Sequence, residues 1–140
     1  MPRADFYLID KPQFRENPLL LVCKLVQHAY SAQQPTLILA RDFGQAEALD
    51  GALWEFDEDA FIPHQLAGDD DDDAIAVLIV PPGQETADRP LVINLRDTVA
   101  PGRYQRVLEV VPAETDAREG SRQRWREYQQ RGFELHKHDM

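Results

Sequence analysis

The residues of this chain that could do chemistry are few, and they stand apart from one another in the sequence. Cys23 is the single cysteine, and His64 lies in an apolar stretch near several acidic residues, where it could act as a general base. His136 and His138, followed by Asp139, have a spacing that could bind a metal ion near the C-terminus. Catalysis or metal binding is therefore one interpretation of each residue.

A structural interpretation is preferred for all of them. Cys23 falls within a helical apolar pattern, where a lone cysteine behaves as a small buried apolar side chain. His64 follows Pro63 among large apolar residues, a setting typical of a contact surface. The two C-terminal histidines belong to residues 133–140, which we expect to form a short frayed tail. We therefore expect no metal ion and no cofactor.

Sequence motifs for nucleotide binding and nucleophilic catalysis are missing. The turn after the first apolar run reads D-K-P-Q-F, without the G-x-G-x-x-G of dinucleotide-binding proteins, and G-x-x-x-x-G-K-[S/T] occurs nowhere. G-x-S-x-G is absent too, and Ser31 and Ser121 have no evident histidine partner. We therefore expect a protein without a catalytic site.

The chain is strongly acidic, with a net charge of −10 and a pI of about 4.7. Direct binding to nucleic acid relies on Lys and Arg that neutralise phosphates, so this balance opposes a DNA-binding module. Residues 55–73 hold nine acidic residues and no basic ones, and five of the acids are the consecutive Asp69 to Asp73. This run lacks the glycine and the distant glutamate of an EF-hand calcium loop. Since its charges repel each other, we expect a solvated, mobile loop that cannot pack.

One segment of this acidic chain is basic. Residues 115–132 hold five arginines, Arg118, Arg122, Arg124, Arg126 and Arg131. Three of them recur at intervals of four residues and form one stripe on a helix, while Trp125 and Tyr128 fall on an adjoining face. Arginines beside an aromatic surface suit a peptide carboxylate next to an apolar side chain. The alternative is a solvated basic face whose aromatic residues pack inward.

A second cluster lies in residues 52–68, which read A-L-W-E-F-D-E-D-A-F-I-P-H-Q-L-A-G. The large apolar residues of this segment lie in or beside an expected loop, and loops run over the protein surface. Apolar side chains held there either fold back on the core or face a partner. From the residues alone, Trp54 and Phe61 fit both interpretations.

Five short apolar runs predict buried strands. They are Phe6–Asp10, Thr36–Ala40, Ala74–Val80, Leu91–Leu95 and Val107–Val111. Three helices are predicted as well. One runs from Pro18 to about residue 32, one follows a capping box of Asp42 and Gln45, and one follows a capping box of Asp116 and Glu119 and ends before Gly132.

These elements predict an α/β fold with three layers, α/β/α, around a mostly parallel five-stranded sheet of Rossmann-like outline. The connections after the third and fourth strands are short for a helical crossover, so one antiparallel pair in the middle would also fit. The length of 140 residues predicts a single domain, residues 1–140. A lone cysteine, and the lack of a signal peptide or a long apolar run, fit a cytoplasmic protein.

The most specific pattern is Trp54 followed by F-I-P-H-Q-L-A-G at residues 61–68. With supporting matches along nearly the whole chain, it resembles the chi subunit of bacterial DNA polymerase III, an accessory protein of the clamp loader. The supporting matches lie at residues 6–10, 45–46, 49–50, 52–54, 93–96, 109–112 and 128–133. The aspartate run departs from the family pattern in a variable loop, and Trp125 stands where another aromatic residue is expected.

The resemblance implies a non-catalytic adaptor with two protein partners. One is the psi subunit, which tethers the family to the clamp loader, and the matching residues are Trp54, Phe61, Pro63 and His64. The other is the acidic C-terminal tail of single-stranded DNA-binding protein, which ends in Phe, and the matching residues are Val111, Arg122, Trp125 and Tyr128. In this interpretation Arg122 binds the terminal carboxylate, and the other three residues form an apolar pocket.

Other functions stay open beside this one. A small α/β nucleotide- or phosphate-binding enzyme is favoured only by the outline of the fold, which by itself does not define function. A direct DNA-binding module is opposed by the net charge of −10. A further partner such as a helicase could also use the surface around Trp54 and Phe61.

Overall fold

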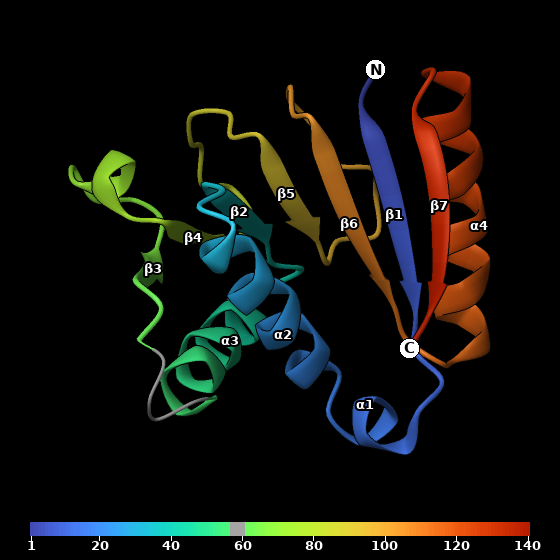
Figure 1. Cartoon of the computed structure of the whole chain (residues 1–140), viewed down its shortest axis with the longest axis horizontal. Coiled ribbons are helices and arrows are strands. Elements are labelled where there is room, and N and C mark those ends of the chain that lie inside the picture. Colours follow the sequence, from blue (N-terminus) through green and yellow to red (C-terminus); the bar gives the residue numbers. More distant parts are fainter. Residues whose placement is uncertain (57–60) are drawn as a thin grey trace.

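The computed structural model describes residues 1–56 and 61–140, and Figure 1 shows a twisted sheet with helices packed against it. The strands are β1 Arg3–Leu8, β2 Thr36–Leu39, β3 His64–Leu66, β4 Val77–Val80, β5 Leu91–Asn94, β6 Arg106–Val111 and β7 Glu134–Asp139. The helices are α1 Pro12–Glu16, α2 Pro18–Ser31, α3 Phe43–Glu55 and α4 Thr115–Gln130, with a 3₁₀ turn, η1, at Asp72–Ala74. Three of the acids noted in the sequence, Asp57, Glu58 and Asp59, lie outside the described residues.

The described sheet has seven strands in the order β3-β4-β2-β5-β6-β1-β7, and every neighbouring pair is parallel. The predicted α/β class and parallel sheet are confirmed, but the count of five strands is wrong because β3 and β7 were not predicted. The antiparallel pair considered for the middle is also wrong. The connections of residues 81–90 and 95–105 lead back to the start of the next parallel strand without a helix. They are long enough to do so, because ten extended residues span roughly 33 Å whereas a four-residue strand is only about 13 Å long.

Alternation along the strands divides the core between the two faces of the sheet. Tyr7 and Ile9 belong to the cluster formed with α2 and α3, whereas Phe6 belongs to the cluster formed with Tyr128 of α4. On the α4 side, the helix packs against β6 and β7, while loop residues such as Val99 and Tyr104 pack against the same cluster. The predicted three-layer arrangement is therefore not confirmed, because α4 and loop residues, and not a full layer of helices, cover this face of the sheet.

The helix ends test the predicted capping boxes. Asp42 Oδ1 accepts a hydrogen bond from the backbone N–H of Gln45 at 2.7 Å, so the cap of α3 is confirmed. The capping box of Asp116 and Glu119 is wrong, because the N-cap of α4 is Glu114, two residues earlier than predicted, and Glu114 makes no side-chain cap bond. Gly132 follows the end of α4 with a φ of +86°, a left-handed conformation that glycine adopts without strain.

The aspartate run is more ordered than its sequence predicts. Residues 69–71 are exposed, but the carboxylate of Asp72 accepts hydrogen bonds from the Gly68 backbone N–H at 2.9 Å and from Gln65 Nε2 at 2.8 Å. Arg89 Nη2 donates to the carbonyl oxygen of Asp72 at 2.9 Å and so holds η1 in place. The predicted solvated loop is confirmed for Asp69, Asp70, Asp71 and Asp73, which are exposed, but the prediction that the run cannot pack is wrong for Asp72, which caps the turn that its neighbours form.

Residues 134–139 form a strand instead of the predicted frayed tail. β7 pairs with β1 along its whole length and lies at the edge of the sheet (Figure 1). Its sequence, E-L-H-K-H-D, contains a single apolar residue, so hydrophobic periodicity gives no signal for a strand. His136 and His138 consequently lie on one face of the sheet.

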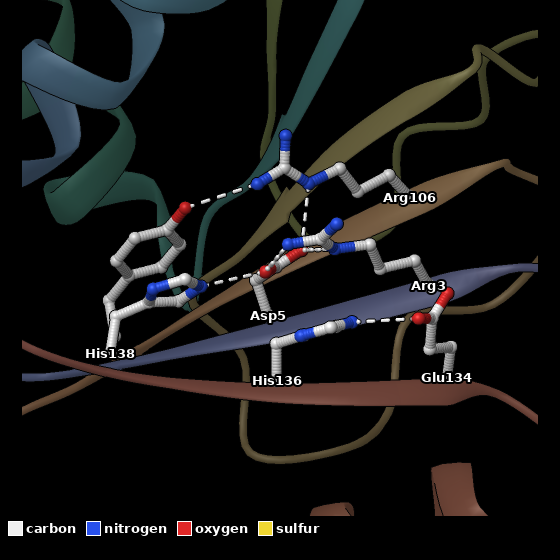
Figure 2. Close-up of polar contacts among 7 residues, drawn as sticks. Arg3, Asp5, Arg106, Glu134, His136 and His138 are labelled. Atoms are coloured by element: carbon white, nitrogen blue, oxygen red, sulfur yellow. Dashed lines mark hydrogen bonds and ion pairs between the residues drawn. The ribbon is translucent and has the colours of Figure 1, made fainter.

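A buried carboxylate on β1 joins β7 on one side of that strand to β6 on the other (Figure 2). Asp5 of β1 accepts hydrogen bonds from Arg3 Nε and Nη2 at 2.9 and 2.8 Å and from Arg106 Nε at 2.7 Å. His138 Nε2 lies 2.8 Å from Asp5 Oδ1, and its ring stacks on Tyr7 with 4.6 Å between centroids. Burial alone would raise the pKa of Asp5, but the hydrogen bonds from Arg3, His138 and Arg106 outweigh it and lower the pKa to about 2.

We expect this carboxylate to make the folding stability depend on pH in acid. Because the folded-state pKa of Asp5 is about 2, the ionised carboxylate makes its full contribution to the unfolding free energy above about pH 4. That contribution is lost as the pH falls towards 2. The loss should amount to about 2 kcal/mol of unfolding free energy. Urea unfolding between pH 5 and pH 2 would measure it, with Asp5→Asn as the variant that cannot ionise. The variant should be less stable at pH 5 and decline less steeply; parallel declines would contradict the assignment.

Candidate functional site

A pocket of about 400 Å³, called here the cationic pocket, lies between α4 and the strands β1 and β7. Its lining combines aromatic and aliphatic side chains with four cations: Phe6, Leu8, Arg118, Ser121, Arg122, Trp125, Arg126 and Lys137. None of these described lining residues is acidic, although the chain has 25 acidic and 15 basic residues. The pocket therefore suits an anionic group attached to an apolar one.

The arginine stripe predicted for the basic helix lines this pocket. Arg122 and Arg126 are exposed, whereas Arg118 is partly buried and donates through Nη2 to the carbonyl oxygen of Ile9 at 2.8 Å. Trp125 is partly buried and meets Phe6 edge to face, with 5.1 Å between ring centroids. The helix thus presents accessible guanidinium groups beside an aromatic floor.

Val111 and Tyr128, the other residues matched to the tail-binding surface, lie beneath the pocket. Both side chains are fully buried and neither lines the pocket. The Tyr128 hydroxyl donates to Glu109 Oε2 at 2.7 Å. The fold therefore brings the four matched residues to one strand and one helix, but only Arg122 and Trp125 reach the pocket.

Four lining residues were missed by the sequence reasoning: Phe6, Leu8, Ser121 and Lys137. The first two share one face of a strand, and the period of two along that strand was a usable signal. Lys137 had no such signal, because β7 is not predicted from its polar sequence.

A buried ion pair supports α4 from below. Glu109 of β6 is fully buried, Arg124 Nε donates to its Oε1 at 2.9 Å, and Asn94 Nδ2 donates to its Oε2 at 2.6 Å. Burial raises the pKa of Glu109, while Arg124, Asn94 and Tyr128 stabilise the charged carboxylate. Arg124 is therefore the structural arginine of the basic helix. The position of Glu109 between the apolar residues of β6 was the sequence signal that a basic or hydrogen-bonding side chain would be buried beside it.

The second predicted cluster is exposed at the opposite edge of the sheet, and we call it the aromatic surface. Trp54 is 57% exposed and Phe61 63% exposed, with 5.4 Å between their ring centroids. His64 lies beside Trp54, with 5.0 Å between centroids, and Pro63 is partly buried. Since Leu53 fills the core at the end of α3 instead, the idea that Trp54 and Phe61 cap the core is not supported.

His64 holds the backbone of this surface in place. Its Nδ1 lies 2.7 Å from the carbonyl oxygen of Ile62, and its Nε2 lies 3.1 Å from Oδ1 of Asp50. The His64 side chain is only 1% exposed. These contacts give the histidine a structural role between α3 and β3.

The other residues considered for chemistry are buried or dispersed. Cys23 is buried, and burial raises the pKa of its thiol to about 11, so the unreactive protonated form prevails at neutral pH. Over residues 1–56 and 61–140, no group of three or more His, Cys, Asp or Glu side chains could hold a metal ion. In the same ranges, no helix has both the length and the apolar character needed to cross a membrane.

The fold and its surfaces define a small, all-parallel α/β domain that exposes aromatic rings and arginines, the residue types enriched at protein–protein interfaces. The model of the family described as DNA polymerase III chi subunit, HolC, matches residues 1–136. The chain therefore belongs to the DNA polymerase III chi subunit family, and the predicted resemblance is confirmed. It is thereby placed among the accessory subunits of this polymerase, in DNA replication.

Individual relatives agree with the family match. The chain is 37% identical to DNA polymerase III subunit chi of Pseudomonas aeruginosa over 146 residues, which covers 100% of this chain and 98% of the relative. It is 30% identical to DNA polymerase III subunit chi of Escherichia coli, covering 96% of each chain. A chain in the complex of a Saccharomyces cerevisiae dbp5 variant with nup159, gle1, ip6 and adp has a TM-score of 0.63 at 13% identity. That match covers 99% of this chain but 42% of the other, and it shows the fold alone.

Proposed function

We propose that the chain is a non-catalytic, cytoplasmic adaptor that links the clamp loader, through the psi subunit, to the acidic C-terminal tail of single-stranded DNA-binding protein. Family membership supports a role in the polymerase III holoenzyme. The observation that carries the proposal is the presence of two surfaces of different chemistry near opposite edges of the sheet. The cationic pocket lies at α4 and β7, and the aromatic surface lies at α3 and β3.

The cationic pocket has the chemistry that an acidic tail ending in Pro-Phe requires. Its floor includes Phe6 and Trp125, against which a terminal aromatic ring can pack. Arg122 is exposed at the same pocket, and its planar fork suits a terminal carboxylate. Val111 and Tyr128 are buried, so in this proposal they support the floor and do not contact the peptide.

The aromatic surface has the chemistry of a hot spot for the psi subunit. Trp54 and Phe61 lie in ring contact and are more than half exposed, so a partner would bury a large apolar area there. Pro63 is partly buried and the His64 side chain is buried, so in this proposal His64 fixes the chain beside these rings. No direct contact with nucleic acid is needed for a protein of net charge −10 to act in this way.

A bridging experiment tests the adaptor directly. The chain, the psi subunit and single-stranded DNA-binding protein would be mixed and separated by size-exclusion chromatography. Psi should elute with the DNA-binding protein only when the chain is present. Trp54→Ala should lose psi but still bind the DNA-binding protein, and Arg122→Ala should lose the DNA-binding protein but still bind psi. If either variant lost both partners, or if psi co-eluted without the chain, the two-surface proposal would be refuted.

Trp54→Ala is expected to weaken binding of psi by about 2 kcal/mol or more, as is typical of an aromatic hot spot. Because the side chain is 57% exposed, the unfolding free energy should change by less than about 1 kcal/mol. Phe43→Ala is the matched control, since Phe43 is also 57% exposed and begins the same helix. Calorimetry with purified psi and urea unfolding would give the two quantities. Equal effects of the two variants on psi binding would contradict the assignment.

A further inference from the structure

Strand β7 contributes one side chain to the cationic pocket, and that side chain is a cation. Lys137 lines the pocket beside Arg118, Arg122 and Arg126. It lies opposite Phe6 in the parallel ladder, and Phe6 is the residue whose ring meets Trp125. The ladder therefore places the lysine next to the aromatic part of the pocket, across from the arginine stripe of α4.

The side chains on the two faces of β7 make different contacts. Leu135 packs against the core on the α4 side, and Lys137 shares that face because it is two residues further along. His138 is on the opposite face, where its Nε2 lies 2.8 Å from the buried carboxylate of Asp5 (Figure 2). Its ring also stacks on Tyr7. Since β7 pairs with β1 on one side only, these contacts add to the ladder in fixing the edge strand.

We propose that Lys137 is the fourth cation of the pocket and binds an acidic side chain of the peptide that precedes its terminal Phe, with His138 as the residue that positions its strand. The inference rests on the proposed function, because it assigns a second anion of the same tail peptide to a residue outside α4. The four described cations of the pocket have no acidic residue among the other lining side chains. A second carboxylate from the peptide would relieve their mutual repulsion.

The chemistry of arginine and lysine fits the assignment of the terminal carboxylate to Arg122 and of an upstream acidic side chain to Lys137. The guanidinium of Arg122 offers a planar fork for the terminal carboxylate, which has a fixed position at the end of the chain. The ammonium of Lys137 is a point charge on a flexible stem, so it can reach side-chain carboxylates whose positions vary. The rival explanation is that Lys137 only protects the sheet edge from pairing with other strands, a common use of lysine.

The test is a peptide titration by calorimetry with wild type, Lys137→Ala, Lys137→Arg and Lys24→Ala. Lys24 is the control because it is a lysine of α2, where its ammonium lies 5.5 Å from the Phe14 ring centroid and outside the pocket. Lys137→Ala should bind the acidic Pro-Phe peptide about two- to fivefold more weakly than wild type, the size expected of an exposed ion pair. Lys137→Arg should restore most of that loss. With a peptide whose upstream acids are changed to amides, Lys137→Ala and wild type should bind alike.

The positioning role of His138 is tested in the same titration. His138→Ala should weaken binding of the acidic peptide in the wild-type background but add little in the Lys137→Ala background. A general loss of stability would weaken binding in both backgrounds, and that result would overturn the positioning role.

The outcomes separate this inference from the proposed function. If wild type binds and Arg122→Ala does not, but Lys137→Ala binds like Lys24→Ala, the lysine assignment is overturned and the adaptor proposal stands. If wild type fails to bind the peptide at all, the proposed tail site is overturned and the lysine assignment with it.

Discussion

Glu109→Ala is expected to lower the free energy of unfolding by about 3–5 kcal/mol, because it leaves the Arg124 guanidinium buried without its partner. The carboxylate of Glu109 is fully buried and accepts from Arg124 at 2.9 Å, Asn94 at 2.6 Å and Tyr128 at 2.7 Å. Removing it therefore takes the acceptor away from three buried donors, one of which is the charged Arg124. A loss of this size is a large fraction of the stability of a typical domain.

Urea unfolding measures this effect, with Glu114→Ala as the control that removes an exposed acid next to the same helix. The control should change the unfolding free energy by less than about 0.5 kcal/mol. Arg124→Ala should cost about as much as Glu109→Ala, and the double variant should cost less than the sum, since the two groups share one contact. Additive losses, or a loss below about 1 kcal/mol for Glu109→Ala, would show that the pair does not support α4.

Arg122→Ala should weaken binding of an acidic Pro-Phe peptide by about 10- to 100-fold, the equivalent of roughly 1.5–3 kcal/mol for a charge-assisted hydrogen bond. Folding should be almost unaffected, because Arg122 is exposed. Arg131→Ala is the matched control: Arg131 follows the same helix, pairs with Glu127 at 2.8 Å and does not line the pocket. Calorimetry gives both affinities.

A peptide with an amidated C-terminus sharpens this prediction. Wild type should lose affinity for it, while Arg122→Ala should bind the free and amidated peptides equally. If amidation weakened both proteins by the same factor, a residue other than Arg122 would hold the terminal carboxylate.

The central strands could be predicted because parallel strands that are buried on both faces read as unbroken apolar runs. β2, β4, β5 and β6 all lie within or close to the predicted runs. β1 begins earlier than predicted, at Arg3, because Asp5 looks like a loop residue in the sequence. Only the fold reveals that Arg3, Arg106 and His138 satisfy this buried carboxylate.

The two edge strands could not be predicted, and the reason is physical. An edge strand is covered less than a central one, and natural proteins keep it short or charged to avoid unwanted pairing. β3 has three residues, and β7 reads E-L-H-K-H-D. Both strands matter for the candidate site, because β3 carries His64 of the aromatic surface and β7 carries Lys137 of the cationic pocket.

The periodicity of the basic helix predicted the arginine stripe, and the structure places all three arginines at one pocket. It could not tell which aromatic residue of the helix would stay accessible. Trp125 remains partly exposed, while Tyr128 is buried over Glu109, a contact that depends on where the helix meets β6. Helical spacing does set Arg124 apart from the stripe and places it four residues before Tyr128, but only the fold reveals that it meets the buried Glu109.

The measurement that tests the account most directly is titration calorimetry of the purified chain with a short acidic peptide that ends in Pro-Phe, compared with the same peptide lacking the terminal Phe. The adaptor proposal predicts saturable binding that weakens with salt and disappears without the Phe. Equal binding of both peptides would mean that the pocket attracts acids without recognising the end of a chain. No binding at high micromolar peptide would contradict the link to single-stranded DNA-binding protein and leave the aromatic surface as the single proposed partner site.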